Sequence, residues 1–176
     1  GSREYINGIY RYILFLDNVS PEEIKGMPYL IKKIKNVRDF RLSSKASEIR
    51  KFAQSPTKFA QTTQPIGMDF IIVPIVSSER RKYIPIGFIN EDIITNNAVQ
   101  IIPKATIYDF GILTSNVHMA WVRVFAGRLK SDYRYSKDIV YNNFPWPNPN
   151  EKQKEKIEKT AQMILDSRAK YPNSSL

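Results

Sequence analysis

The 176-residue sequence contains no cysteine, a single histidine and only seven glycines. Without cysteine, disulfides and cysteine-ligated zinc sites are excluded. The glycines are never closely spaced, so a glycine-rich cofactor-binding loop is missing as well. The sequence also has no run of 18 apolar residues, and its N-terminus lacks a signal-peptide pattern. These absences argue against a secreted or membrane-spanning chain, and we expect a cytoplasmic one.

Positive charge is the feature that the sequence has in excess. Lysine and arginine number 27 against 17 aspartate and glutamate, which gives a net charge of +10 and a pI near 9.7. Residues 31–60 alone hold nine basic and two acidic residues. This surplus favours a phosphate-bearing partner, although a solvated helix face is the usual explanation for a run of charge. The candidate DNA-backbone contacts of this segment are Lys45, Arg50 and Lys51.

Hydrophobic periodicity predicts an α+β fold, a small mixed β-sheet flanked by helices. Strands are predicted over residues 9–16, 65–76, 83–89 and 98–102, where β-branched and aromatic residues concentrate. Ser20 and Pro21 mark the start of a helix, because serine caps helices and proline suits the first turn. Apolar residues at helical spacing continue through 30–37 and 46–53, and a C-terminal surface helix is predicted over 151–170.

Residues 107–147 combine an apolar helix with a cationic arm. The helix is predicted from a stripe of apolar residues, with a cap within 114–116 and an end near Gly127. A basic, tyrosine-containing segment follows, and the two prolines around Trp146 make a stiff turn after it. A core helix with an ordinary loop explains the pattern about as well as a polyanion-binding arm does. The stripe is Leu113, Val117, Ala120, Trp121 and Val124; the basic candidates are Arg123, Arg128, Lys130 and Arg134, and Tyr133 is a candidate for stacking on a base or sugar.

Several segments resemble the C-terminal part of the MmeI-like class of DNA adenine methyltransferases, which occurs in single-chain restriction-modification enzymes. The likeness extends over roughly residues 5–165, which is most of the chain. It includes residues 10–12 (YRY) and the run 41–53. Its most particular segments are 76–81 (VSSERR), 83–88 (YIPIGF), 110–113 (FGIL), 118–121 (HMAW), 127–136 (GRLKSDYRYS) and 141–147 (YNNFPWP).

The resemblance implies that residues 1–150 form a target recognition domain, with the helix and tail of 151–176 packed on it as one structural unit. In that class the domain lies downstream of a catalytic domain that uses S-adenosylmethionine, so we interpret the chain as part of a larger enzyme. The chain itself is expected to be non-catalytic. The implied partners are double-stranded DNA and the catalytic domain of the same polypeptide, with no membrane, in the bacterial cytoplasm and associated with the nucleoid. An endonuclease in the same protein is a possibility that the sequence leaves open.

The charged link between the strands predicted over 65–76 and 83–89 is the candidate base-reading element. Glu79 and Arg81 would point to one side of an extended chain, because alternate residues of a strand share a face. Arginine donates twice to guanine and glutamate accepts from cytosine, so the pair suits a G·C step. The resemblance implies that an acid and a base at these places help to choose a base pair. A hairpin tip with an internal Glu–Arg ion pair is the alternative; Lys82 and Ser47 are further base-reading candidates.

Three other constellations are explained more simply by structure than by chemistry. His118 has no histidine or cysteine partner and is expected to be packed or hydrogen-bonded, so no metal site is predicted. Asp17, Glu23 and Lys25 are the nearest approach to a nuclease cluster, but Glu23 lies where a helix cap would use it. The segment 143–146 (NFPW) is only superficially similar to the Asn/Asp-Pro-Pro-aromatic motif of adenine methyltransferases, since phenylalanine replaces the first proline.

The predicted function is sequence-specific recognition of duplex DNA for an N6-adenine methyltransferase of a restriction-modification system. Two alternatives remain open. One is an RNA- or single-strand-binding module that uses the same basic and aromatic surface. The other is a non-catalytic protein-docking domain whose charge only keeps it soluble.

Overall fold

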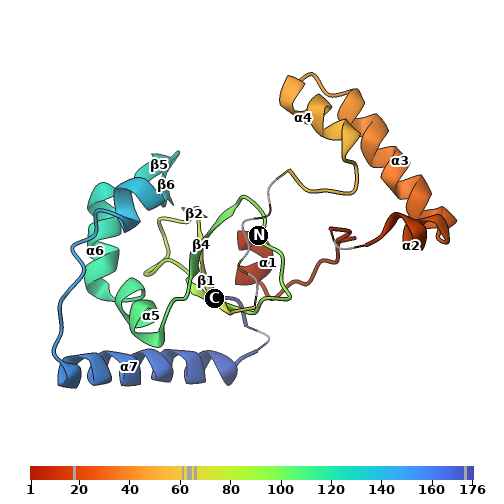
Figure 1. Cartoon of the computed structure of the whole chain (residues 1–176). Coiled ribbons are helices and arrows are strands. Elements are labelled where there is room, and N and C mark those ends of the chain that lie inside the picture. The colour runs from red at the N-terminus through yellow and green to blue at the C-terminus, as the bar shows by residue number, and fades with distance from the viewer. Residues whose placement is uncertain (18, 61, 63–64, 66, 173) are drawn as a thin grey trace. The chain divides into compact units, whose positions relative to one another are not determined.

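The computed structural model describes residues 1–17, 19–60, 62, 65, 67–172 and 174–176, and it divides into two compact units. The first unit comprises Gly1–Arg11 and Thr63–Leu176, and the second comprises Tyr12–Thr62 (Figure 1). The sequence did not predict this division. The assignment of 1–150 and 151–176 as the two parts of one structural unit stays a prediction.

The second unit consists of short helices around one longer helix. Its elements are α2 (Pro21–Lys25), α3 (Pro28–Leu42), α4 (Ser47–Lys51) and the 3₁₀ turn η1 (Phe52–Gln54). The Ser20 hydroxyl accepts a hydrogen bond from the Glu23 amide at 3.3 Å, and the Glu23 carboxylate accepts one from the Ser20 amide at 2.8 Å. This capping box confirms the predicted helix start and accounts for Glu23.

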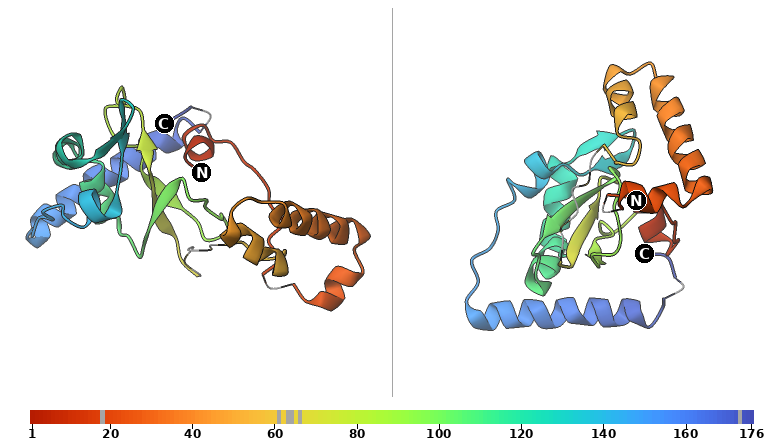
Figure 2. Two further views of the ribbon diagram at one scale, coloured as in Figure 1. Left: turned by 90° about the horizontal axis from the view of Figure 1, so that it is seen from above. Right: turned by 45° about the vertical axis from the view of Figure 1, so that its right-hand side comes forward.

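In the second unit, α3 forms a helical hairpin with α4 and η1 (Figure 2). The side chain of Arg41 closes this hairpin. Its guanidinium donates to the carbonyl oxygens of Phe52, Ser55 and Lys58, at 2.9, 2.8 and 2.8 Å. Three carbonyl partners satisfy this side chain within the unit, so Arg41 stabilises the hairpin and is not a free cation.

The first unit contains two three-stranded sheets, and every strand pairing that the structure describes in them is antiparallel. We call them sheet A, with strand order β3-β1-β4, and sheet B, with strand order β2-β6-β5. The α+β class is thereby confirmed. The strands are β1 (Phe70–Pro74), β2 (Val76–Ser77), β3 (Gly87–Ile89), β4 (Val99–Pro103), β5 (Gly127–Leu129) and β6 (Asp132–Arg134).

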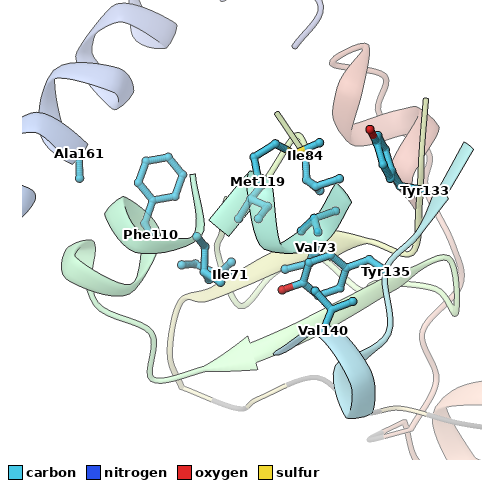
Figure 3. Close-up of a cluster of buried hydrophobic side chains, with 12 residues drawn as sticks. Ile71, Val73, Ile84, Phe110, Met119, Tyr133, Tyr135, Val140 and Ala161 are labelled. Carbon is cyan, nitrogen blue, oxygen red and sulfur yellow. The ribbon is translucent and has the colours of Figure 1, made fainter. Parts of the chain in front are cut away.

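Strand β1 is central in sheet A and is buried on both faces. Ile71 and Val73 belong to the main hydrophobic core (Figure 3). Phe70 and Ile72 belong to a smaller cluster on the other face of the strand. An almost continuous apolar run suits a strand of this kind. Pro74 lies beyond the pairing with β3, which ends at Ile72, so its missing amide hydrogen disturbs no bond to that neighbour.

Helices cover the core of the first unit. They are α1 (Ser2–Ile6), α5 (Ile107–Leu113), α6 (Asn116–Phe125), the π-helical turn η2 (Lys137–Tyr141) and α7 (Glu151–Ala169). The C-terminal helix is thus confirmed, and it packs against α5. A Cβ on Gly111 of α5 would lie 2.8 Å from Ile157 Cγ2 and 3.1 Å from Ala161 Cβ, so this close approach requires glycine. No described helix is long and apolar enough to cross a membrane.

The apolar face predicted for the central helix is wrong. The Ser115 side chain caps α6, within the predicted stretch, but α5 has already ended at Leu113. The predicted stripe treats α5 and α6 as one continuous helix. Two of its members, Val117 and Val124, are 70% and 73% exposed. The face that α6 actually buries carries Met119 and Val122.

The strand predicted over residues 9–16 is wrong as well. These residues form neither helix nor strand, and Tyr10 and Tyr12 are 78% and 95% exposed. β-branched and aromatic residues favour strands, but a strand also needs a neighbour for its backbone groups.

Candidate nucleic-acid interface

Sheet B brings two turns together that are about fifty residues apart in the sequence. Strand β2 pairs antiparallel with β6, with Val76 opposite Arg134 and Ser77 opposite Tyr133. The segment that follows β2 therefore lies beside the segment that precedes β6. The turn at 78–81 and the β5–β6 hairpin turn at 130–131 consequently share one end of the sheet, which we call the paired tips.

The link at 78–81 is a tight turn, and the extended conformation predicted for it is wrong. The Arg81 amide donates to the Ser78 carbonyl at 3.1 Å, and the Arg80 amide donates to the Ser78 hydroxyl at 3.3 Å. The Glu79 amide donates to Asp132 Oδ1, at 3.3 Å, across the sheet. Glu79 and Arg81 therefore do not share a face through strand alternation.

The side chains of this turn differ in exposure. Glu79 is exposed, whereas Arg81 is half-buried and its guanidinium donates to the Leu176 carbonyl. The ion pairs within the described part of the chain involve Glu4 and Glu48, so the alternative of a Glu79–Arg81 pair is not formed there. The exposed Lys82 follows the turn.

Lys130 lies at the tip of the β5–β6 hairpin in a backbone conformation that lysine rarely adopts. Its φ is 57°, in the left-handed region that favours glycine, and the residue is exposed. Beside it, the Arg128 guanidinium donates to the Ser131 carbonyl at 2.9 Å and lies 4.0 Å from the centre of the Tyr133 ring. The hairpin thus holds Arg128 in place and projects Lys130.

The remaining predicted cations of this unit, Arg123 and Arg134, do not gather on one face of the tips, and Arg134 lies at the end of β6 away from the hairpin turn. The Arg123 guanidinium donates to the Lys82 carbonyl at 3.3 Å, which places it beside the turn at 78–81. Arg134 lies opposite Gly127 in the hairpin register, and Arg128 lies opposite Tyr133. Because alternate residues point to opposite faces, Arg134 and Arg128 face opposite sides of sheet B.

Tyr133 belongs to the main hydrophobic core. It is 6% exposed, and the guanidinium of Arg128 covers its ring. A base reaches this ring only if Arg128 leaves it, so the structure argues against the predicted stacking. Charged neighbours in the sequence suggested exposure, but strand alternation turns the ring inward.

In the second unit, two of the predicted contacts are engaged by the protein itself. One terminal nitrogen of Arg50 donates to the carbonyls of Ser44 and Lys45, both at 2.8 Å. Lys51 pairs with Glu48 at 2.8 Å on the surface. Lys45 and Ser47 are exposed.

The comparisons with known proteins agree on one relationship. Residues 1–148 match the family model described as MmeI, target recognition domain. The chain belongs to this family. It is 43% identical over 168 residues to DNA methyltransferase A of Bacillus subtilis (strain 168), a match that covers 96% of this chain and 19% of that protein. A solved structure of the Type IIL restriction-modification enzyme MmeI in complex with DNA matches with a TM-score of 0.95 and 46% identity, covering 100% of this chain and 23% of that one.

The chain therefore spans about a fifth of the length of these two relatives. The family assignment confirms the resemblance to MmeI-like enzymes. It does not test which residues of this target recognition domain contact DNA, and those assignments stay predictions.

His118 is a packed side chain in this domain, as expected. It is fully buried, its Nε2 lies 2.9 Å from the Tyr135 hydroxyl, and its ring meets Phe144 edge-on. Its Nδ1 is buried without a hydrogen-bond partner among the described residues. Burial lowers the pKa of His118 to about 4, because no nearby group compensates for the loss of water around a charged ring.

The segment 143–146 is packed in the same region. Phe144 is buried, and its ring lies edge-on to Trp121 and Trp146. The Asn143 amide donates to the Asp138 carbonyl at 2.6 Å. These contacts give the segment a structural role. Within the described residues, no group of three or more histidine, cysteine or acidic side chains is placed to hold a metal ion.

Asp132 is the residue of the paired tips that sequence reasoning missed. Its one signal is an acid inside a basic segment, which is common on any surface. Its partner, the Glu79 amide, is 53 residues away in the sequence. Only the strand pairing brings the two together.

Proposed function

We propose that this target recognition domain binds duplex DNA and selects a specific sequence for a DNA methyltransferase. The observation that carries the proposal is the pairing of two cation-bearing turns at one end of sheet B. A site of this kind can contact phosphates with one set of side chains and base edges with another.

The phosphate contacts are assigned to the basic residues of both units. Around the paired tips, Lys130 is projected and Arg128 is held in place beside it. A preorganised guanidinium loses less side-chain entropy when it meets a phosphate. The full set is Lys45, Arg50, Lys51, Arg123, Arg128, Lys130 and Arg134.

The base-reading contacts are assigned to the turn at 78–81, to Lys82 after it and, separately, to Ser47 of the second unit. Glu79 is exposed there and accepts from a base amino group in the major groove. Arg81 is assigned the guanine of the same base pair, to which an arginine can donate twice. Lys82 and Ser47 complete the set.

The protein in which this domain works is proposed to be an N6-adenine methyltransferase of a bacterial restriction-modification system, with or without an endonuclease. The names of the two relatives support a DNA methyltransferase and a restriction-modification enzyme. Its catalytic domain would bind S-adenosylmethionine, since this chain has no glycine-rich loop to do so. DNA binding would place it in the cytoplasm at the nucleoid. We expect this chain alone to leave DNA unmethylated and uncut.

Competition binding tests the proposal against the two alternatives. A labelled random-sequence duplex is bound by this chain and competed with unlabelled duplex, single-stranded DNA, RNA or an acidic protein at several salt concentrations. The proposal predicts that duplex competes best and that affinity falls steeply with salt. Better competition by single-stranded DNA or RNA would support the single-strand alternative, and competition by acidic protein alone would support the docking alternative.

A further inference from the structure

An acidic side chain, Asp132, adjoins the basic paired tips and is hydrogen-bonded to the turn at 78–81. Asp132 begins β6 and is half-buried. Arg128, Lys130 and Arg134 lie on the same hairpin, and Arg80 is exposed on the facing turn. A negative charge at this place repels the phosphates that these cations attract, so its presence weakens binding to any DNA sequence.

Charge neutralisation does not account for Asp132. No cation lies within ion-pair distance of its carboxylate in the described residues, where the ion pairs belong to Glu4 and Glu48. Its partner is a backbone group instead, the Glu79 amide at 3.3 Å.

That hydrogen bond continues the sheet where the strand pairing stops. The pairing of β2 with β6 ends with Ser77 opposite Tyr133. Beyond it the chain turns away through the bond from the Arg81 amide to the Ser78 carbonyl. The side chain of Asp132 then replaces a backbone acceptor and ties the corner of the turn to the hairpin.

We propose that Asp132 is a positioning residue: its carboxylate oxygen holds the turn at 78–81 against the β5–β6 hairpin, so that Glu79 meets the bases in a fixed orientation. The inference rests on the proposed function. It adds that selectivity requires the turn at 78–81 to be bonded to the hairpin. A turn that is free to move presents the Glu79 carboxylate to several neighbouring base edges.

Two substitutions separate the acceptor from the charge. Asp132→Asn keeps a side-chain oxygen and removes the negative charge, whereas Asp132→Ala removes both. Asp132→Leu keeps a branch at Cγ, as asparagine does, but has no acceptor, and it replaces the alanine variant if that one does not fold. Asp138→Ala is the matched control, since it removes an exposed acid of the same unit outside the paired tips.

The first measurement selects bound duplexes from a random-sequence pool and sequences them. We expect Asp132→Ala to lose about tenfold or more of the preference at one base pair, within the range of a base contact, while its overall affinity is kept or raised. Asp132→Asn should keep the wild-type preference, as should Asp138→Ala. A purely structural role would instead change stability and total binding without altering one position.

The second measurement is hydrogen exchange at the Glu79 amide, followed by NMR without DNA. It should be slow in the wild type and in Asp132→Asn, and several-fold faster in the alanine or leucine variant. The inference is overturned if the alanine or leucine variant selects the same sequence with undiminished preference. It is also overturned if Asp132→Asn loses as much of the base-pair preference as Asp132→Ala does. If the wild type enriches no sequence at all, the proposed function fails first, and this inference with it.

Discussion

The buried ring of His118 predicts how the stability of the first unit depends on pH. Its pKa is lowered from 6.5 to about 4 by burial. Between these values the unfolded chain binds a proton that the folded chain refuses, so stability is complete above pH 6.5 and falls as the pH falls towards 4. With these two pKa values, the contribution of His118 to the free energy of unfolding should drop by about 2 kcal/mol between pH 7 and pH 5, and by about 3 kcal/mol once the pH is below 4.

The sequence makes this prediction clean, because His118 is the single histidine. Urea unfolding at pH 7 and pH 5 can be followed by tryptophan fluorescence, since Trp121 and Trp146 both lie in the first unit. His118→Gln cannot gain a proton and keeps an amide near the Tyr135 hydroxyl. It should be less stable than the wild type at pH 7, with little further loss at pH 5. A wild type whose stability is the same at both pH values, or a glutamine variant that falls as steeply, would refute the reasoning.

Two further predictions concern the helix packing and the paired tips. Gly111→Ala should destabilise the first unit by about 1–3 kcal/mol in thermal unfolding, because its methyl group would meet Ile157 at 2.8 Å, whereas Gly127→Ala in the same unit, where the contacts begin at 3.8 Å, should not. An unchanged midpoint for Gly111→Ala would contradict the close contact of α5 with α7. Replacing Arg128 and Lys130 together by alanine should weaken binding to every duplex alike and reduce the slope of log affinity against log salt by about 0.9 for each phosphate that is no longer neutralised. Replacing the exposed Lys152 and Lys156 of α7 should leave that slope alone; an equal change for both pairs would mean that only net charge matters.

Local chemistry predicted two of the helix starts and the C-terminal helix of this chain. Ser20 with Glu23 and Ser115 before α6 act within four residues of their partners, so their capping roles follow from neighbours in the sequence. The C-terminal helix was similarly placed, since α7 spans Glu151–Ala169.

The features that local sequence did not predict depend on strand pairing between segments that are far apart in the chain. The stretch 9–16 has the composition of a strand but pairs with none of the strands that the structure describes, so it stays irregular. Tyr133 is flanked by charges but is turned into the core by its place in β6. The base-reading candidates were found as a charged link between strands, yet the hairpin beside it and the bond from the Glu79 amide to Asp132 depend on strand register. Register is a property of the folded sheet and is not written in either segment alone.

The central claim is that the turn at 78–81 reads DNA sequence, and a charge exchange tests it most directly. Glu79→Lys combined with Arg81→Asp reverses the two charges and keeps their sum. Bound sequences are then selected from the same random duplex pool for the wild type and the exchanged chain. The account predicts that the preferred base changes at one position, by the ~1–3 kcal/mol of a bidentate contact, while the other positions stay the same. An exchanged chain that folds, binds and selects every position as the wild type does would contradict it.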